Sequence, residues 1–257
     1  MPEVRKFEDF FYRKNNSVEK IDVLINYYEK NGNTACYNNY IFCPECHIAN
    51  LVFVHHQRTP HLRTIPSSQH AAGCSYNYPY AKTETISKYI EELSYKQVIS
   101  RLGAMMRLLM PENNNSESLQ ENLTTKNNPL LFNEEENEKI TRVIKKTIRR
   151  QRLSGWIDKS IAGKLHLFYG DVQISSEKLI SKSKNIYFRW ILKTKNRYGE
   201  WKYRTSLYRG IKSDEFESDA IYKIVFIGTP SFESGYLNIQ LDNNDAVLYK
   251  KIINAIS

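Results

Sequence analysis

The chain has 257 residues and a formal net charge of +9, and 41% of its residues are hydrophobic. This hydrophobic content excludes a wholly disordered chain, and the length suits one large domain or two small ones. The longest apolar runs, at residues 51–54 and 224–227, fall far short of the roughly 20 residues of a membrane span. Residues 1–10 lack the apolar core of a secretory signal. We therefore expect a cytoplasmic protein with no membrane partner.

The positive charge is concentrated in one block. Residues 139–212 hold 20 lysines and arginines against 4 acidic residues, whereas acidic residues outnumber basic ones in the rest of the chain. A surface without a special role would mix the two signs more evenly. A concentrated positive field attracts polyanions, above all nucleic acid. A generally lysine-rich composition is the alternative, but it does not explain why acidic residues are scarce in this block.

The first half of the chain shows helical periodicity on both sides of an irregular stretch. Apolar spacing predicts helices over residues 16–32 and 84–110. Asn16 is the expected N-cap of the first helix, and Gly32 is its expected end. Residues 111–138 are rich in asparagine and acidic residues, which predicts a flexible linker.

The second half begins with a predicted basic helix over residues 139–152 and then turns strand-like. A short helix over residues 245–255 is expected near the end of the chain. Alternating apolar and polar residues predict strands over residues 165–175, 186–195, 200–208, 221–228 and 236–241.

The strongest local signal is Cys43-Pro-Glu-Cys46, followed by His70-Ala-Ala-Gly-Cys74. A Cys-x-x-Cys knuckle places two thiolates on one tight turn, and a second pair further along completes a tetrahedral site. Three cysteines and one histidine are a common structural zinc set, and such a closed site stabilises a segment whose apolar core is thin. We therefore expect structural Zn²⁺ bound by Cys43, Cys46, His70 and Cys74.

Other assignments of the cysteines and histidines remain open from the sequence. His61, His55 and His56 compete with His70 for the fourth position, and Cys36 is a reserve ligand. A redox-active Cys-x-x-Cys pair expects a βαβ setting, which the pattern lacks. Disulfides are disfavoured in the compartment that we expect.

The pair His55-His56 follows the knuckle on an extended segment. This arrangement resembles the ββα-metal (HNH) nucleases, some of which carry a histidine pair beside a zinc-stabilised fold. The resemblance implies a metal-dependent nuclease that uses His55 or His56, although the chain departs from the family pattern downstream, where a clear Asn and a final His are missing. The alternative is that both are polar surface residues. Phosphate-binding Gly loops, nucleophile elbows and HExxH motifs are absent from the sequence, which favours a noncatalytic protein.

Basic and aromatic residues alternate in the segment 182–212, which holds ten lysines and arginines, one acidic residue and seven aromatic residues. Strict alternation puts Ile186, Phe188, Trp190 and Leu192 on a core face, which Trp201, Tyr203 and Leu207 can join, and puts basic residues and tyrosines on the opposite face. Basic side chains neutralise phosphates, and tyrosines stack on bases. The predicted nucleic-acid-binding residues are Lys145, Lys146, Arg149, Arg150, Arg152, Tyr187, Arg189, Lys193, Lys195, Lys202, Arg204 and Tyr208.

These patterns together predict an α+β protein in two parts. Residues 1–110 are expected to form a small zinc-ribbon or treble-clef-like module with flanking helices, and residues 111–138 the linker. Residues 139–257 are expected to form the basic helix and a mostly antiparallel five-stranded β module that resembles an OB-type barrel.

The first functional hypothesis is a noncatalytic protein that binds single-stranded or distorted DNA or RNA through a basic aromatic sheet face. An HNH-like metal-dependent nuclease and an adaptor that binds an acidic protein partner in a larger complex are the alternatives. The first hypothesis requires the basic residues of the block 139–212 to converge on one continuous surface.

Overall fold

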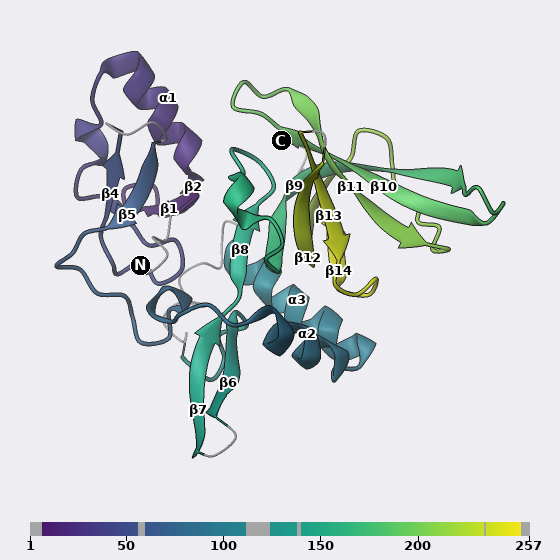
Figure 1. Cartoon of the computed structure of the whole chain (residues 1–257). Helices are drawn as coiled ribbons and strands as arrows, with labels where there is room; N and C mark the ends of the chain where they lie inside the picture. Colours follow the sequence, from purple (N-terminus) through teal and green to yellow (C-terminus); the bar gives the residue numbers. More distant parts are fainter. Residues whose placement is uncertain (1–6, 56–59, 112–123, 138–139, 234, 253–257) are drawn as a thin grey trace. The chain divides into compact units, whose positions relative to one another are not determined.

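The computed structural model of the chain describes residues 7–55, 60–111, 124–137, 140–233 and 235–252 (Figure 1). Two compact units are present, one made of Met1–Tyr80 with Arg107–Thr147 and the other of Ala81–Met106 with Ile148–Ser257. Each unit therefore draws on two separate stretches of the chain. The domain boundaries expected from the sequence, at residues 110 and 139, remain predictions.

The first unit combines short strands with one helix. Its elements are β1 (Asp9–Tyr12), β2 (Ser17–Lys20), α1 (Ile21–Asn31), η1 (Ala35–Tyr37), β3 (Ile41–Phe42), β4 (Leu51–Val54), β5 (His61–Thr64), η2 (Ser75–Asn77), β6 (Leu131–Asn137) and β7 (Ile140–Thr147). The strands form three small antiparallel sheets with the orders β2-β1-β3, β4-β5 and β6-β7. Aromatic and aliphatic side chains of β1, α1 and β3 to β5 form a buried core that also contains Cys43, Cys46 and Cys74.

The second unit is built on a seven-stranded sheet. Its elements are α2 (Thr83–Glu91), most of α3 (Tyr95–Leu109), β8 (Arg149–Arg152), η3 (Lys159–Ile161), β9 (His166–Ile180), β10 (Ile186–Lys195), β11 (Trp201–Gly210), β12 (Ile221–Glu233), β13 (Tyr236–Leu241) and β14 (Val247–Lys251). The strand order is β11-β10-β9-β12-β13, with β14 paired to β12 and β8 paired to β9. All of these pairs are antiparallel except β8 with β9. None of the helices in the described ranges has both the length and the apolar composition that crossing a membrane requires.

The large sheet is strongly curled because its two longest strands change partners along their length. The first half of β9 pairs with β8 and β12 and its second half with β10, while β12 leaves β9 and continues against β13. Gly228 lies where β12 changes partner, and a Cβ atom there would be 2.6 Å from the Gln240 carbonyl oxygen. Only glycine allows the two strands to approach so closely. The first and last strands of the order, β11 and β13, contact each other, as expected for a sheet curled towards a half-barrel.

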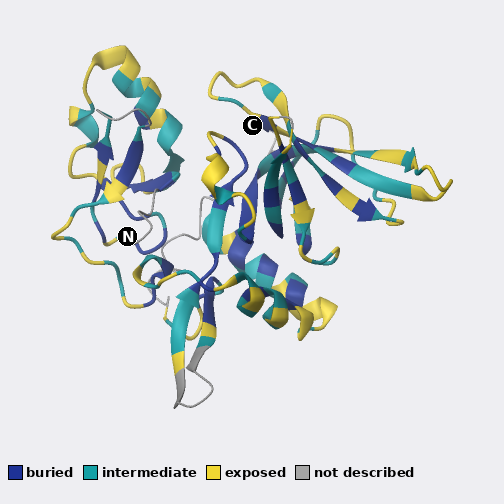
Figure 2. Cartoon of the chain, viewed as in Figure 1, coloured by how far each residue is buried: buried dark blue, intermediate teal, exposed yellow. Residues whose placement is uncertain are grey.

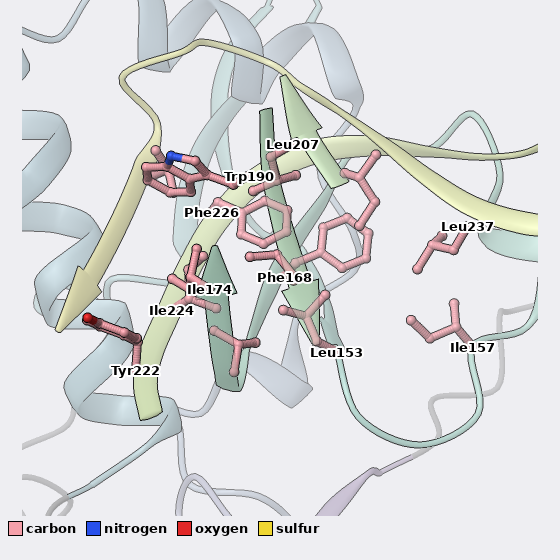
Figure 3. Packing of buried hydrophobic residues seen from close by; sticks show 14 residues of the cluster. Leu153, Ile157, Phe168, Ile174, Trp190, Leu207, Tyr222, Ile224, Phe226 and Leu237 are labelled. Atoms are coloured by element: carbon pink, nitrogen blue, oxygen red, sulfur yellow. The ribbon is translucent and has the colours of Figure 1, made fainter. Parts of the chain in front are cut away.

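The concave side of this sheet holds the apolar core of the second unit. Trp190, Phe168 and Phe226 are fully buried there, together with Leu192 and Leu207 (Figure 3). These side chains come from alternate positions of neighbouring strands, as a sheet with one buried face requires. The core assignment of Trp190, Leu192 and Leu207 from the sequence is therefore confirmed, whereas Ile186 is 46% exposed and Phe188 is half-buried. The loops and the β10–β11 turn are mainly exposed (Figure 2).

The predicted basic helix over residues 139–152 is wrong. The structure forms strands there, because β7 pairs with β6 and β8 pairs with β9. β-Branched residues favour the extended conformation, and strand pairing supplies hydrogen bonds that compete with helical spacing. The extended form also separates the basic side chains onto two faces, whereas a helix would bring like charges together at i,i+4.

Other helix and linker predictions hold only in part. The first helix ends at Gly32 in the left-handed conformation, as predicted, but it begins after Lys20, because residues 17–20 pair with β1 instead. The predicted helical region 84–110 is confirmed as α2 and α3. The predicted C-terminal helix 245–255 is wrong where described, since β14 pairs with β12. Within the predicted linker 111–138, residues 112–123 lie outside the described residues, and β6 occupies its last part.

Candidate functional site

The four predicted metal ligands come together in the first unit. Cys43 and Cys46 lie on the turn between β3 and β4, where the Cys43 amide donates to the Ala49 carbonyl at 2.8 Å. The backbone NH of Glu45 also points at the Cys43 sulfur, at 3.5 Å. His70 and Cys74 follow β5. A turn between Ala71 and Cys74 directs the Cys74 side chain towards Cys43 and Cys46. The local sequence thus builds two tight turns that face each other.

The distances between the ligand atoms fit a tetrahedral metal ion. The ligand atoms of Cys43, Cys46, His70 and Cys74 all lie within 4.8 Å of one another. The Cys43 and Cys74 sulfurs are 3.8 Å apart, and the His70 Nδ1 atom lies 3.6 Å from the Cys46 sulfur and 3.5 Å from the Cys74 sulfur. Thiolates bound tetrahedrally at about 2.3 Å from a metal are separated by about 3.8 Å. A disulfide needs about 2.05 Å, and all four cysteines are free.

The His70 ring is held in the orientation that metal binding requires. Its Nδ1 atom faces the sulfurs, and its Nε2 atom lies 3.0 Å from the Thr64 hydroxyl. A hydrogen bond at the second ring nitrogen fixes the tautomer and the direction of a ligating histidine. The rings of Phe7 and Tyr76 stack on the same imidazole. The four ligands can therefore hold a metal ion without rearrangement.

The three thiols do not ionise alike in this arrangement. Hydrogen bonds from Cys43 and Cys74 lower the pKa of Cys46, whereas burial raises the pKa values of Cys43 and Cys74. Burial and the shared hydrogen bonds thus shift the pKa values of the three thiols in opposite directions. A coordinated metal deprotonates its thiol ligands, so metal binding here releases protons and weakens in acid.

A buried carboxylate within the knuckle was missed by the sequence analysis. Glu45 is only 2% exposed, and its carboxylate accepts hydrogen bonds from the Ser75 amide, the Ser75 hydroxyl and the Asn128 amide group. Asn128 also donates to the Gly73 carbonyl at 2.8 Å. Glu45 thereby connects the two metal-binding turns with the segment before β6. An acidic residue between two cysteines gives no sequence signal of such burial.

The competing ligand assignments are not part of this cluster. The group of ligating side chains found among the described residues contains neither Cys36, His55 nor His61. The His55 ring packs against the rings of Tyr28 and Phe53, at centroid distances of 4.2 and 5.9 Å. His56 lies outside the described residues, and the nuclease hypothesis remains a prediction.

The second candidate site is the side of β10 and β11 that faces away from the apolar core. We call it the outer face and define it by residues of both strands. They are Tyr187, Arg189, Ile191, Lys193, Lys195, Trp201, Tyr203, Ser206 and Tyr208. Residues directly opposite each other in the register share this side of the sheet, as do alternate residues along a strand.

Basic and aromatic side chains are paired across the outer face. Lys193 lies opposite Tyr203, and Lys195 lies opposite Trp201, with its Nζ atom 5.3 Å from the Trp201 ring centroid. Tyr203 and Tyr208 are 47% and 57% exposed. At the other end of the face the rings of Tyr187 and Tyr208 lie 5.5 Å apart.

Trp201 and Tyr203 are on the outer face because of a β-bulge, and their predicted place in the core is wrong. The register jumps between Leu192/Thr205 and Lys193/Tyr203, which leaves Arg204 as an extra residue on β11. A bulge reverses the alternation beyond it. Lys202 consequently lies opposite Thr194, away from the outer face, and Arg204 donates to the Gly155 carbonyl at 2.8 Å. Strict alternation could not reveal this change.

The remaining predicted nucleic-acid-binding residues are dispersed. Lys145 and Lys146 lie on β7 in the first unit. Arg149, Arg150 and Arg152 lie on β8 in the second unit, where Arg152 is only 8% exposed and its guanidinium lies over the Tyr169 ring. The basic block is therefore divided between two units, and its convergence on one surface remains a prediction.

Acidic residues offset part of the charge near the outer face. Arg189 forms an ion pair of 2.7 Å with Glu177 on β9, and Lys202 forms one of 3.3 Å with Glu200. Hydrogen bonding to Asn196 and then the Lys202 interaction lower the pKa of Glu200. Lys193 and Lys195 are exposed and provide the cationic part of the outer face next to its aromatic rings.

Comparison with known proteins gave no match: no family model, curated protein or solved structure corresponds to this chain. The function of the chain is therefore inferred from the two candidate sites themselves.

Proposed function

We propose that this chain is a zinc-stabilised protein that binds single-stranded or distorted DNA or RNA through the outer face of β10 and β11. The metal centre supports the fold, and the outer face makes the contacts. The pairing across that face of two exposed lysines with aromatic rings, Lys193 with the exposed Tyr203 and Lys195 with the half-buried Trp201, is the observation that carries the proposal.

Zinc is the metal that best fits the ligand set. Three sulfurs and one imidazole nitrogen are soft to borderline ligands in a tetrahedral arrangement, which zinc prefers over the hard cations. Because the protein supplies all four ligands, the site has no open position for substrate or water, which is typical of a structural site. The knuckle between β3 and β4 resembles a zinc ribbon or treble clef. Elemental analysis of protein purified without chelator is expected to give one zinc per chain.

The outer face suits unpaired nucleic acid better than a regular duplex. Lys193 and Lys195 can neutralise neighbouring phosphates, while Tyr203, Trp201 and Tyr208 present ring faces to bases. Bases in a single strand are free to stack on such rings, but bases inside a duplex are not. The curled antiparallel sheet is compatible with an OB-like half-barrel, an architecture that binds single strands on its sheet surface.

A binding titration over a range of salt concentrations tests this proposal. Affinity for single-stranded DNA or RNA is expected to fall steeply with salt, because phosphate contacts release counterions. In Lys193→Ala/Lys195→Ala the magnitude of the slope of log K against log salt should be smaller by about 1.4, which corresponds to two lost phosphate contacts on a single strand.

Lys88→Ala/Lys96→Ala is the matched control, since it removes two exposed lysines from the helices of the same unit. Its salt slope should remain that of the unmodified protein. Absence of binding at low salt, or binding that does not depend on salt, would overturn the proposal. Capture of an acidic protein that survives nuclease treatment, without any binding to nucleic acid, would instead support the adaptor hypothesis.

A further inference from the structure

Trp156 is strongly exposed to solvent, which the sequence pattern did not indicate. It is 75% exposed, and it lies in the loop between β8 and η3. The residues around it are buried, since Leu153 is 0% and Ile157 is 7% exposed, and both belong to the apolar core of the second unit. Tryptophan is normally among the more buried residues. The loop thus turns its indole ring outwards between two core anchors.

The loop that carries Trp156 is fixed at several points. Before the ring, the Leu153 amide donates to the Tyr169 carbonyl at 2.8 Å, and the Gly155 carbonyl accepts the hydrogen bond from Arg204. After the ring, the Gly163 amide donates to the Pro230 carbonyl at 2.9 Å.

Gly155 has a φ of +85°, a left-handed conformation that favours glycine. Because the loop is already ordered, a ligand that contacts the ring has little conformational entropy to remove.

Arg204, whose guanidinium donates to the loop at Gly155, brings a positive charge to the loop. Arg204 is the bulge residue of β11, and Lys202 precedes it on the side of the sheet opposite to the outer face. Lys159 and Lys164 follow Trp156 in the same connection. The connection thus combines an exposed ring with an arginine that bonds its backbone, with two lysines and with one acidic residue, Asp158. Rings and cationic groups together bind unpaired bases and their phosphates.

We propose that Trp156 stacks on an unpaired base of a bound single-stranded nucleic acid. This inference rests on the proposed function and adds a contact that lies outside the outer face. The β-bulge separates Lys202 and Arg204 from the outer face. Binding at Trp156 would give these two residues a role in contacting the nucleic acid.

Intrinsic fluorescence provides the test, because the chain has only three tryptophans. Trp190 is fully buried, so Trp156 and Trp201 are the ones that a base can reach. Titration with a short oligothymidylate is expected to quench the emission of the unmodified protein. Trp156→Phe should lose the part of this quenching that Trp156 contributes and keep the part that Trp201 contributes, and Trp156→Ala should bind about 5- to 150-fold more weakly. Trp201→Phe is the matched control and should retain the quenching contributed by Trp156.

An abasic oligonucleotide of the same length separates stacking from charge attraction. It keeps the phosphates, so it should still bind weakly, but it should not quench Trp156. If Trp156→Ala and Trp156→Phe bind the oligothymidylate as tightly as the unmodified protein, with unchanged quenching, the inference is overturned while the proposed function stands.

If the unmodified protein binds neither DNA nor RNA, the proposed function fails and the inference fails with it. Equal affinity for poly-glutamate and the oligothymidylate, with no quenching by either, would also count against stacking. Because Trp156 is exposed, its replacement should leave the melting temperature nearly unchanged, and a thermal melt confirms that each variant is folded.

Discussion

In the first unit the buried residues surround four side chains that could hold a metal ion, whereas in the second unit they form a large apolar cluster inside a curled sheet. The sheets of the first unit have two or three short strands, and those of the second have long strands that share partners. Small sheets bury little apolar surface and depend on additional links such as metal ions. If the proposed metal is bound, the two units therefore have different sources of stability within one chain.

Metal removal should give the largest difference in stability between the two units. Cys46→Ser, or treatment with a strong chelator, is expected to unfold the metal-binding part of the first unit, because structural zinc contributes on the order of 10 kcal/mol to folding. Amide hydrogen exchange should show lost protection in β3 to β5 and retained protection in β9 to β12.

Cys36→Ser is the matched control for that experiment, since Cys36 is not a member of the ligand cluster. It should retain both its zinc and its protection pattern. Equal loss of protection in both units after chelation would contradict the idea that only the first unit depends on a metal for its stability.

The converse experiment removes an anchor from the apolar core of the second unit. Trp190 is fully buried and contacts the rings of Phe216 and Tyr249. Trp190→Ala is expected to lower the free energy of unfolding by about 3–5 kcal/mol, because the cavity cannot close completely. Urea denaturation followed by far-UV circular dichroism measures the change, and the zinc content should not fall. Loss of zinc from this variant would show that the two units depend on each other.

A smaller effect is expected from the buried carboxylate of the first unit. Glu45→Gln replaces an acceptor of three hydrogen bonds by an amide, whose NH₂ group cannot accept them. The free energy of unfolding of the zinc-bound protein should fall by about 1–3 kcal/mol. The exposed residue Glu29 supplies the control, and Glu29→Gln should leave stability nearly unchanged. Equal stability of the two variants would mean that Glu45 does not connect the metal-binding turns.

Short-range signals were the most reliable part of the sequence. The spacing of Cys43, Cys46, His70 and Cys74 predicted the cluster of ligands because a metal site requires close ligands on tight turns. The glycine at position 32 ends α1 as expected, since the left-handed conformation there favours glycine. Each turn and the helix end depend on geometry within a few neighbouring residues, whereas the approach of the two turns, 24 residues apart at Cys46 and His70, is a tertiary contact.

Signals that depend on distant partners failed more often. Residues 139–152 have helical spacing, yet β6 and β9 recruit them into sheets. Alternation along 200–208 placed Tyr203 in the core, but the β-bulge at Arg204 places it on the outer face. The sequence showed the composition of these segments but did not show which strand each of them would pair with.

The amino-acid sequence by itself indicated the two cysteine-containing turns and the approximate positions of the long strands of the sheet, because ligand spacing and strand alternation are local properties of the chain. The fold, and not the sequence, selected His70 over His55 and His61. Tertiary structure decided the pairing of the basic segments, the burial of Glu45 and the display of Trp156. It also divided the basic block between two units. Strand partners, bulges and loop anchors arise from contacts between residues far apart in the chain, and a local pattern does not encode them.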